Sequence, residues 1–156
     1  MYDEMPLRGA KSMRRGNREK IKHLIYSSKP AQFDKNVLKG ILISSRKNNP
    51  EKRVTGSLIC CSDFFIQFLE GPPRNIDILY DKILSDKRHT DIVKLREVNF
   101  DRRLFASWAM RFDNCEDWIL ENICVGEGYV KKIRPDDAFA IFEKLSREGD
   151  QFLDPP

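Results

Sequence analysis

The segment SDFFIQFLEGPP, residues 62–73, constrains the fold more than any other part of the chain. Its aromatic and β-branched content predicts a strand that GPP ends, and the apolar residues around its centre leave neither face of that strand polar. Gln67 nevertheless stands in the middle. A buried carboxamide costs roughly 1–3 kcal/mol unless it is hydrogen-bonded, so the sequence predicts a polar partner for Gln67 inside the fold.

Strands and helices are predicted in the order βαββαββ. The apolar runs 22–28, 53–62, 64–71, 91–100 and 107–112 predict strands, and the helical spacing in 34–49 and 74–87 predicts two helices. Gly56 indicates a bulge or a close backbone approach in the second strand. This order is typical of a ferredoxin-like α+β domain over residues 21–113, with two helices on one face of a mixed sheet. Amphipathic segments at 116–126 and 135–149 predict that helices of a C-terminal extension, 114–156, cover the other face.

The composition excludes several classes of protein. Much of the net charge of +4 comes from a basic segment over residues 1–20, which we expect to be a solvated arm, with contact to nucleic acid or an anionic surface as the alternative. No secretory signal or membrane span is expected. The four cysteines lack CxxC spacing and are expected to be apolar fillers in a reducing cytoplasm.

Several polar residues fall where a featureless core would not place them. Tyr26 lies near the end of the first strand, Asn48 and Asn49 end the first helix, and Trp108 and Met110 alternate on the last predicted strand and so share one face. Taken singly, each has an ordinary structural explanation: a packed ring, a helix stop or a core residue.

Together these residues predict a binding slot. The first and third strands commonly lie side by side in this topology, which would make Tyr26 and Gln67 neighbours beneath the two helices. Ile41 and Ile83 would be the apolar walls of a slot suited to a planar amphipathic ligand. We find no nucleophile beside a base and no phosphate-binding glycine motif, so we do not expect an enzyme.

Five segments of the chain form a joint pattern: LIYSS with Tyr26 and Ser28, SSRKNNPEKRVTG with Asn49, FFIQFLEGPP with Gln67, SDKRHTDIVKL with His89, and RRLFASWAMRF with Trp108 and Met110. With this pattern the chain resembles the BLUF domain, a blue-light sensor that uses flavin. The resemblance spans residues 22–112, and the interval from Asn49 to Gln67 (67 − 49 = 18) is that of the family.

The resemblance implies a flavin, FAD or FMN, bound noncovalently between the two helices. Asn49 would hydrogen-bond the C4 carbonyl and N3 of the ring, with Asn48 beside it, and Gln67 would lie between Tyr26 and the flavin N5. Residues that follow the second helix would lie where the ribityl chain and phosphate leave the slot. These residues are Asp86, Arg88 and His89.

The resemblance also implies a mechanism. Light would draw an electron and then a proton from Tyr26, and the Gln67 amide would rearrange and leave a new hydrogen bond to the flavin that shifts the absorption to the red. Trp108 or Met110 would pass the change through the last strand to the helices after residue 113. The resemblance does not say which of the two faces the flavin. A homo-oligomer or a downstream effector protein is expected as the partner.

Three alternatives remain open at this stage. A BLUF domain can regulate an enzyme fused to it, but the chain ends at Pro156, which favours a short stand-alone sensor. A ferredoxin-like module for nucleic acid or a small ligand could use the basic arm, although the sheet lacks the exposed aromatic pair that stacks bases. An acylphosphatase-like enzyme shares the topology, but no phosphate-cradling loop follows the first strand.

Overall fold

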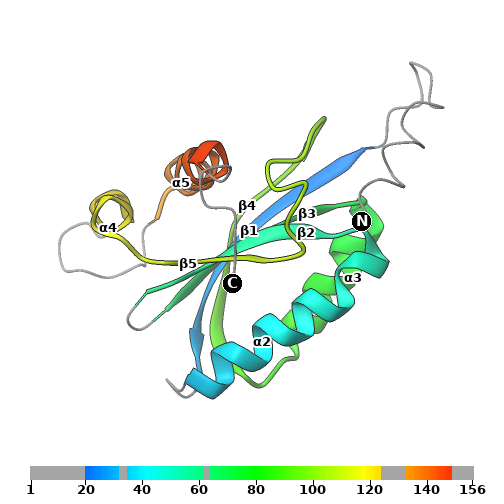
Figure 1. Ribbon diagram of the computed structural model, residues 1–156, viewed down its shortest axis with the longest axis horizontal. Coiled ribbons are helices and arrows are strands. Elements are labelled where there is room, and N and C mark those ends of the chain that lie inside the picture. Colours follow the sequence, from blue (N-terminus) through cyan, green and yellow to red (C-terminus); the bar gives the residue numbers. More distant parts are fainter. Residues whose placement is uncertain (1–19, 32–34, 62–63, 124–132, 149–156) are drawn as a thin grey trace.

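The computed structural model describes residues 20–31, 35–61, 64–123 and 133–148. Five strands form one sheet in the order β4-β1-β3-β2-β5 (Figure 1). Their pairing is antiparallel except between β2 and β5, which run parallel, so the predicted mixed sheet is confirmed. Residues 1–19 of the basic arm and Cys124 lie outside the described residues. The strands are β1 (Ile21–Pro30), β2 (Thr55–Cys60), β3 (Phe65–Gly71), β4 (His89–Phe100) and β5 (Arg111–Asn114).

Helices cover both faces of the sheet. Helices α2 (Lys35–Asn48) and α3 (Pro73–Leu84) lie together on one face, and α4 (Asp117–Ile123) and α5 (Pro135–Glu148) lie on the other (Figure 1). A short 3₁₀ turn, η1 (Pro50–Lys52), follows α2. The βαββαββ order and the two-sided covering both match the sequence prediction.

Strand β3 is buried along its whole length because it serves two cores. Phe65 and Leu69 belong to the core under α2 and α3, whereas Ile66 and Phe68 belong to the core under α4 and α5. Successive side chains of a strand point to opposite faces, so a strand with a helical layer on each side has no solvent face. This explains the continuous apolar run that the sequence shows.

Gly56 permits a close approach between β2 and β3. A Cβ atom at this position would lie 2.1 Å from the Phe68 carbonyl oxygen, closer than any side chain allows. The register from Thr55 opposite Glu70 to Cys60 opposite Phe65 is continuous. Of the two predictions for Gly56, the close approach is therefore right and the bulge is wrong.

The last strand begins later than predicted. β5 starts at Arg111, so Trp108 and Met110 precede it in an irregular loop and do not share one face of a strand. Met110 is buried in the core under α2 and α3, and Trp108 packs against the core under α4 and α5. The prediction was wrong because the backbone at Trp108 makes a single hydrogen bond to β2 outside the regular ladder. Gly56 N donates to the Trp108 carbonyl at 3.1 Å, and the parallel ladder between β2 and β5 begins only after this bond.

A buried carboxylate fixes that loop to the sheet. Glu70, fully buried on β3, accepts hydrogen bonds from Leu104 N and Phe105 N, both at 2.7 Å, and from Thr55 Oγ1 at 2.9 Å. Burial raises the pKa of Glu70, and these three donors lower it in part. The loop between β4 and β5 therefore depends on one side chain for two of its backbone donors.

His23 lies beside this carboxylate on the same face. Its Nε2 donates to the Arg102 carbonyl at 3.0 Å, and its ring stacks on Phe100 with centroids 4.5 Å apart. Burial lowers the pKa of His23 to about 4, so the ring is neutral near pH 7.

Replacement of Glu70 tests this anchor. We expect Glu70→Ala to lower the free energy of unfolding by roughly 2–4 kcal/mol, because two buried amides lose their acceptor. Glu97→Ala is the control: Glu97 lies at the surface of β4 and pairs with Lys22 and Lys94, and such pairs contribute about 1 kcal/mol or less. Urea denaturation measures both variants, and equal losses would contradict the anchoring role.

Candidate functional site

A cavity of about 200 Å³ lies over the sheet between α2 and α3. It is lined by both apolar and polar groups. Every cofactor-binding residue predicted from the sequence lines this cavity except Ser28. The lining residues are Tyr26, Ile41, Ser44, Ser45, Asn48, Asn49, Lys52, Gln67, Leu69, Leu79, Lys82, Ile83, Asp86, Arg88 and His89.

A chain of three buried side chains begins at the floor of the cavity, which Tyr26 and Gln67 line, and ends at Met110 behind it. Tyr26 and Gln67 stand opposite each other in the antiparallel β1–β3 register. The Tyr26 hydroxyl donates to Gln67 Oε1, and Gln67 Nε2 donates to Met110 Sδ at 3.3 Å. The predicted polar partner of Gln67 is confirmed, and Met110 is the residue of the loop that touches it.

The Tyr26 hydroxyl keeps its proton throughout the usual pH range. The ring is 3% exposed, and this burial raises the pKa of Tyr26 well above its ordinary value. A phenol in this state donates its hydrogen bond to the amide oxygen and carries no negative charge. The proton can therefore pass to Gln67 only if a change in the net charge of the tyrosine ring makes the hydroxyl more acidic.

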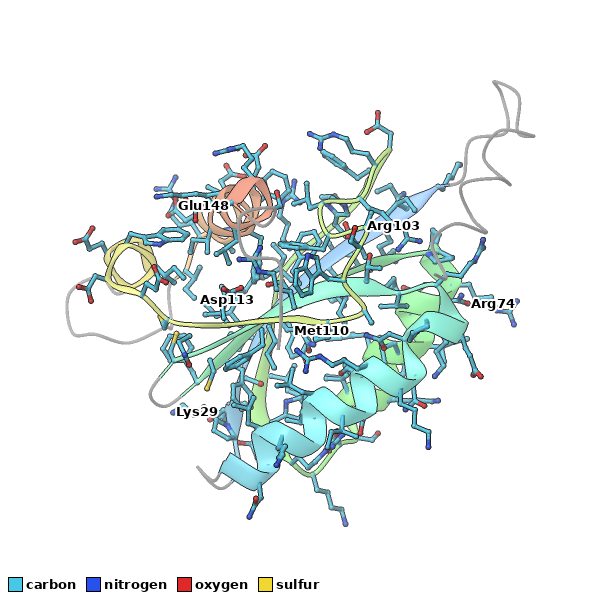
Figure 2. All side chains as sticks on the ribbon, viewed as in Figure 1. Lys29, Arg74, Arg103, Met110, Asp113 and Glu148 are labelled. Carbon is cyan, nitrogen blue, oxygen red and sulfur yellow. The ribbon has the colours of Figure 1, made fainter. Side chains whose placement is uncertain are left out.

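The C-terminal end of α2 holds the backbone beside Met110. Asn49 Nδ2 donates to the Ala109 carbonyl at 2.9 Å, and Arg46 Nε donates to the Met110 carbonyl at 3.1 Å. Figure 2 shows Met110 on the side of the sheet that faces α2. Asn49, which is buried, therefore both lines the cavity and anchors the loop.

The opposite part of the lining comes from the turn between α3 and β4. Arg88 binds Asp86 through Nε at 3.0 Å and through Nη2 at 2.7 Å, and this pairing lowers the pKa of Asp86. His89 Nδ1 and Ser28 Oγ share a hydrogen bond of 3.0 Å. Ser28 therefore contacts a residue of the cavity lining, although it does not line the cavity itself. The other ring nitrogen of His89, Nε2, is buried and makes no hydrogen bond within the described residues.

Sequence reasoning missed several residues of the lining. Ser44, Ser45 and Leu79 lie one helical turn from predicted residues, at the i+3 and i+4 positions that share a helix face. That spacing was the available signal. Lys52 and Lys82 come from separate elements, and no pattern in the sequence joins them.

The two lysines form a positive patch at the cavity. A side-chain hydrogen bond with Lys82 is the main cause of a lowered pKa at Lys52, and burial and the repulsion from the Lys82 charge lower it further. An anionic group placed beside them would relieve this repulsion. Among the described residues, no group of three histidine, cysteine or acidic side chains is placed to hold a metal ion.

Comparison with known proteins identifies the domain. The sequence profile of the BLUF family, described as sensors of blue light using FAD, matches residues 21–111. The photoactivated adenylate cyclase subunit alpha of Euglena gracilis is 42% identical over 59 residues, which are 38% of this chain and 6% of that protein. An alpha-like protein of the same organism is 32% identical over 100 residues, 62% of this chain and 10% of that protein.

Solved structures match over most of the chain. The dark-state structure of the BLUF protein BlrB has a TM-score of 0.70 at 23% identity and covers 84% of this chain and 98% of its own; at this identity the likeness shows the fold. A bacterial light-regulated adenylyl cyclase matches with a TM-score of 0.59 at 29% identity, over 86% of this chain and 37% of its own. The chain thus spans only a small part of the cyclases that it matches.

The chain belongs to the BLUF family. It carries the family's flavin-binding blue-light sensor domain, and the fold expected from the resemblance is confirmed.

The residues around the cavity fit a flavin. The isoalloxazine ring is planar, with apolar edges and one edge of carbonyl and N–H groups. The cavity offers Ile41, Leu79 and Ile83 as apolar walls, amides at its floor, and an unused buried nitrogen on His89. The positive patch of Lys52 and Lys82 suits the phosphate of such a cofactor.

The His89 ring provides a pH test of the site. Burial lowers its pKa below 6.5, as it does for His23, the other histidine of the chain. As the pH falls, the two histidines bind protons at a higher pH in the unfolded chain than in the folded protein. Both rings therefore contribute stability above pH 6.5 that is lost as the pH falls toward the pKa values of the folded protein.

We expect NMR titration of the ring carbons to give both midpoints below 6.5, with His23 near 4. His89→Gln assigns the two signals because it removes one of them. A His89 midpoint at or above 6.5 would contradict the buried, neutral ring described above.

Proposed function

We propose that the cavity between α2 and α3 holds FAD and that the hydrogen-bonded chain Tyr26–Gln67–Met110 converts light absorption into movement of the C-terminal helices. The observation that carries the proposal is the continuity of this chain. It runs from the cavity floor to the residue that directly precedes β5. The description of the BLUF family as sensors that use FAD supports FAD over FMN as the cofactor.

Tyr26 is the electron donor in this proposal. The bound flavin supplies a strong oxidant when blue light excites it. A phenol becomes strongly acidic when it loses an electron, so the Tyr26 proton passes along the existing hydrogen bond to Gln67 Oε1. The raised pKa of Tyr26 keeps this proton in place in the dark, which ties its transfer to the photochemical step.

Gln67 is the element that changes state. In the structure its oxygen accepts from Tyr26 and its nitrogen donates to Met110. Rotation of the amide would exchange these roles, and tautomerisation would turn the oxygen into a donor. Either change alters the hydrogen bond that holds Met110 and the bond that the amide can offer to the flavin.

Asn49 and the turn after α3 position the cofactor. Asn49 is proposed to bind the C4 carbonyl and N3 of the ring, with Asn48 beside it, and Ile41 and Ile83 to enclose its faces. Asp86, Arg88 and His89, with Ser28 behind His89, bind the ribityl side. Lys52 and Lys82 add charge that is complementary to the phosphates.

The conformational change passes through β5 to the C-terminal helices in this proposal. Arg111 follows Met110 directly, and its Nη1 donates to the Leu145 carbonyl of α5 at 3.0 Å. A displacement of Met110 therefore acts on a residue that already holds α5. Trp108 packs on the α4 and α5 side and is proposed to follow the same movement. The segment 114–156 serves as the output region.

The partner is proposed to be a second copy of this chain or a separate effector protein. Solved relatives include a bacterial light-regulated adenylyl cyclase and BlrP1 of Klebsiella pneumoniae, in structures with manganese and cy-diGMP. Those chains are longer than their match to this one, and this chain is proposed to act as a sensor without catalysis of its own. No helix of the described residues is long and apolar enough to span a membrane. A cytoplasmic location is proposed.

The Tyr26→Phe variant tests the photochemical step. It should bind flavin with nearly unchanged affinity yet lose the red shift after blue light, because no phenol hydroxyl remains to donate the proton. Absorption spectra before and after illumination measure both properties. Tyr80→Phe is the matched control, since this ring lies with its centroid 5.9 Å from that of Tyr26. A normal red shift in Tyr26→Phe would exclude Tyr26 as the donor.

The Arg111→Gln variant tests the output route. Wild-type protein should change its small-angle scattering or its partner affinity on illumination, and Arg111→Gln should keep the red shift but lose most of that change. Arg147→Gln is the control because Arg147, on α5, is 67% exposed in its side chain and contacts only Glu143 among acidic groups of the described residues. Identical scattering and binding of the wild type in dark and light would refute an output through these helices.

A further inference from the structure

Two cysteines meet where β2 and β5 end. The parallel register pairs Ser57 with Arg111 and continues to Cys60 with Asn114. One further step in each strand brings Cys61 opposite Cys115. The hydrogen bond from Cys115 N to the Cys60 carbonyl, 3.1 Å long, shows that the two chains remain together past the last paired position.

The Cys61 and Cys115 side chains point to the same face of the sheet. Cys61 is buried in the core under α4 and α5, together with Ile119 of α4, and Cys115 packs against that core. Neighbouring strands lie about 4.8 Å apart, which falls within the usual range of roughly 4.4–6.8 Å between the Cα atoms of a disulfide. The two cysteines are 54 residues apart in the sequence (115 − 61), so no short cysteine motif indicates that they are neighbours.

Cys60 differs from its neighbour in direction and in chemistry. Its side chain packs on the opposite face, against the core under α2 and α3. Burial raises the pKa of the Cys60 thiol, whereas a hydrogen bond with the Cys61 side chain lowers the pKa of the Cys115 thiol. Cys115 is partly exposed, and a partly exposed thiol with a lowered pKa is the reactive kind.

We propose that Cys61 and Cys115 are a redox-sensitive pair that a peroxide converts into a disulfide. The Cys115 thiolate attacks one oxygen of hydrogen peroxide and releases hydroxide, which gives a sulfenic acid on Cys115. The Cys61 sulfur then attacks the Cys115 sulfur and displaces the hydroxyl group, which leaves as water with the Cys61 proton. In sum, two thiols and one peroxide yield one disulfide and two waters, so the peroxide takes both electrons.

The disulfide would join the turn between β2 and β3 to Cys115, which directly follows β5 and lies two residues before α4. Cys61 belongs to that turn, where its N–H donates to the Phe64 carbonyl at 2.9 Å. The covalent link would restrict the start of the C-terminal helices without touching the cavity between α2 and α3. Formation of the disulfide requires neither light nor the cofactor, so its test needs no illumination.

The experiment treats the full chain in the dark with hydrogen peroxide, alkylates the remaining thiols under denaturing conditions and maps the peptides by mass spectrometry. Of the four cysteines, two should resist alkylation, and a peptide that links Cys61 to Cys115 should appear and vanish with a reductant. Cys61→Ser and Cys115→Ser should abolish the link. Cys60→Ser, a neighbouring thiol on the opposite face, is the matched control and should leave it intact.

Peptide mapping of the wild type needs no variant to fold, so its outcome decides the proposal. A link that uses Cys60 or Cys124 in place of this pair would overturn it. Sulfinic or sulfonic acid on Cys115, with Cys61 still open to alkylation, would also overturn it, as would four cysteines that all remain alkylatable.

Discussion

The structure depends on one constraint, which is that β3 must be buried on both faces. A strand in this position can carry a polar side chain only where the fold supplies a partner. β3 carries two such side chains that point in opposite directions: Gln67 toward α2 and α3, and Glu70 toward α4 and α5. Tyr26 satisfies the first and the backbone of the loop before β5 satisfies the second. The strand therefore fixes both the polar chemistry of the cavity floor and the position of the loop before β5.

The loop between β4 and β5 joins the two sides of the sheet. Glu70 anchors its first half from one face, and Asn49 and Arg46 hold its last residues from the other. Met110 ends the loop against Gln67, and Arg111 begins β5 with a bond to α5. Because adjacent residues of one backbone contact Gln67 at the cavity floor and helix α5, no long relay of side chains separates the cavity from that helix.

The sequence predicted the order of elements, the sheet and most of the cavity because these depend on local signals. Apolar periodicity revealed β3 and α3, and a polar residue in an apolar strand revealed Gln67. Trp108 and Met110 were misplaced because their alternation looks like a strand. The hydrogen bonds that hold this part of the loop come from Gly56, Asn49 and Arg46, all distant in sequence. Lys52 and Lys82 were missed for the same reason. Contacts between separate elements leave no periodic pattern in either one.

The shortness of β5 has a consequence for how such a domain can change in evolution. β5 has four residues and pairs with β2 alone, at the edge of the sheet. An edge strand of this length can shift while the four-stranded remainder, which carries Tyr26 and Gln67, stays paired. If the output runs through β5 as proposed, sequence changes after residue 110 can adapt the domain to different effectors with little effect on the colour it absorbs. The light-absorbing part could then serve many outputs because the shortest strand of the sheet connects it to them.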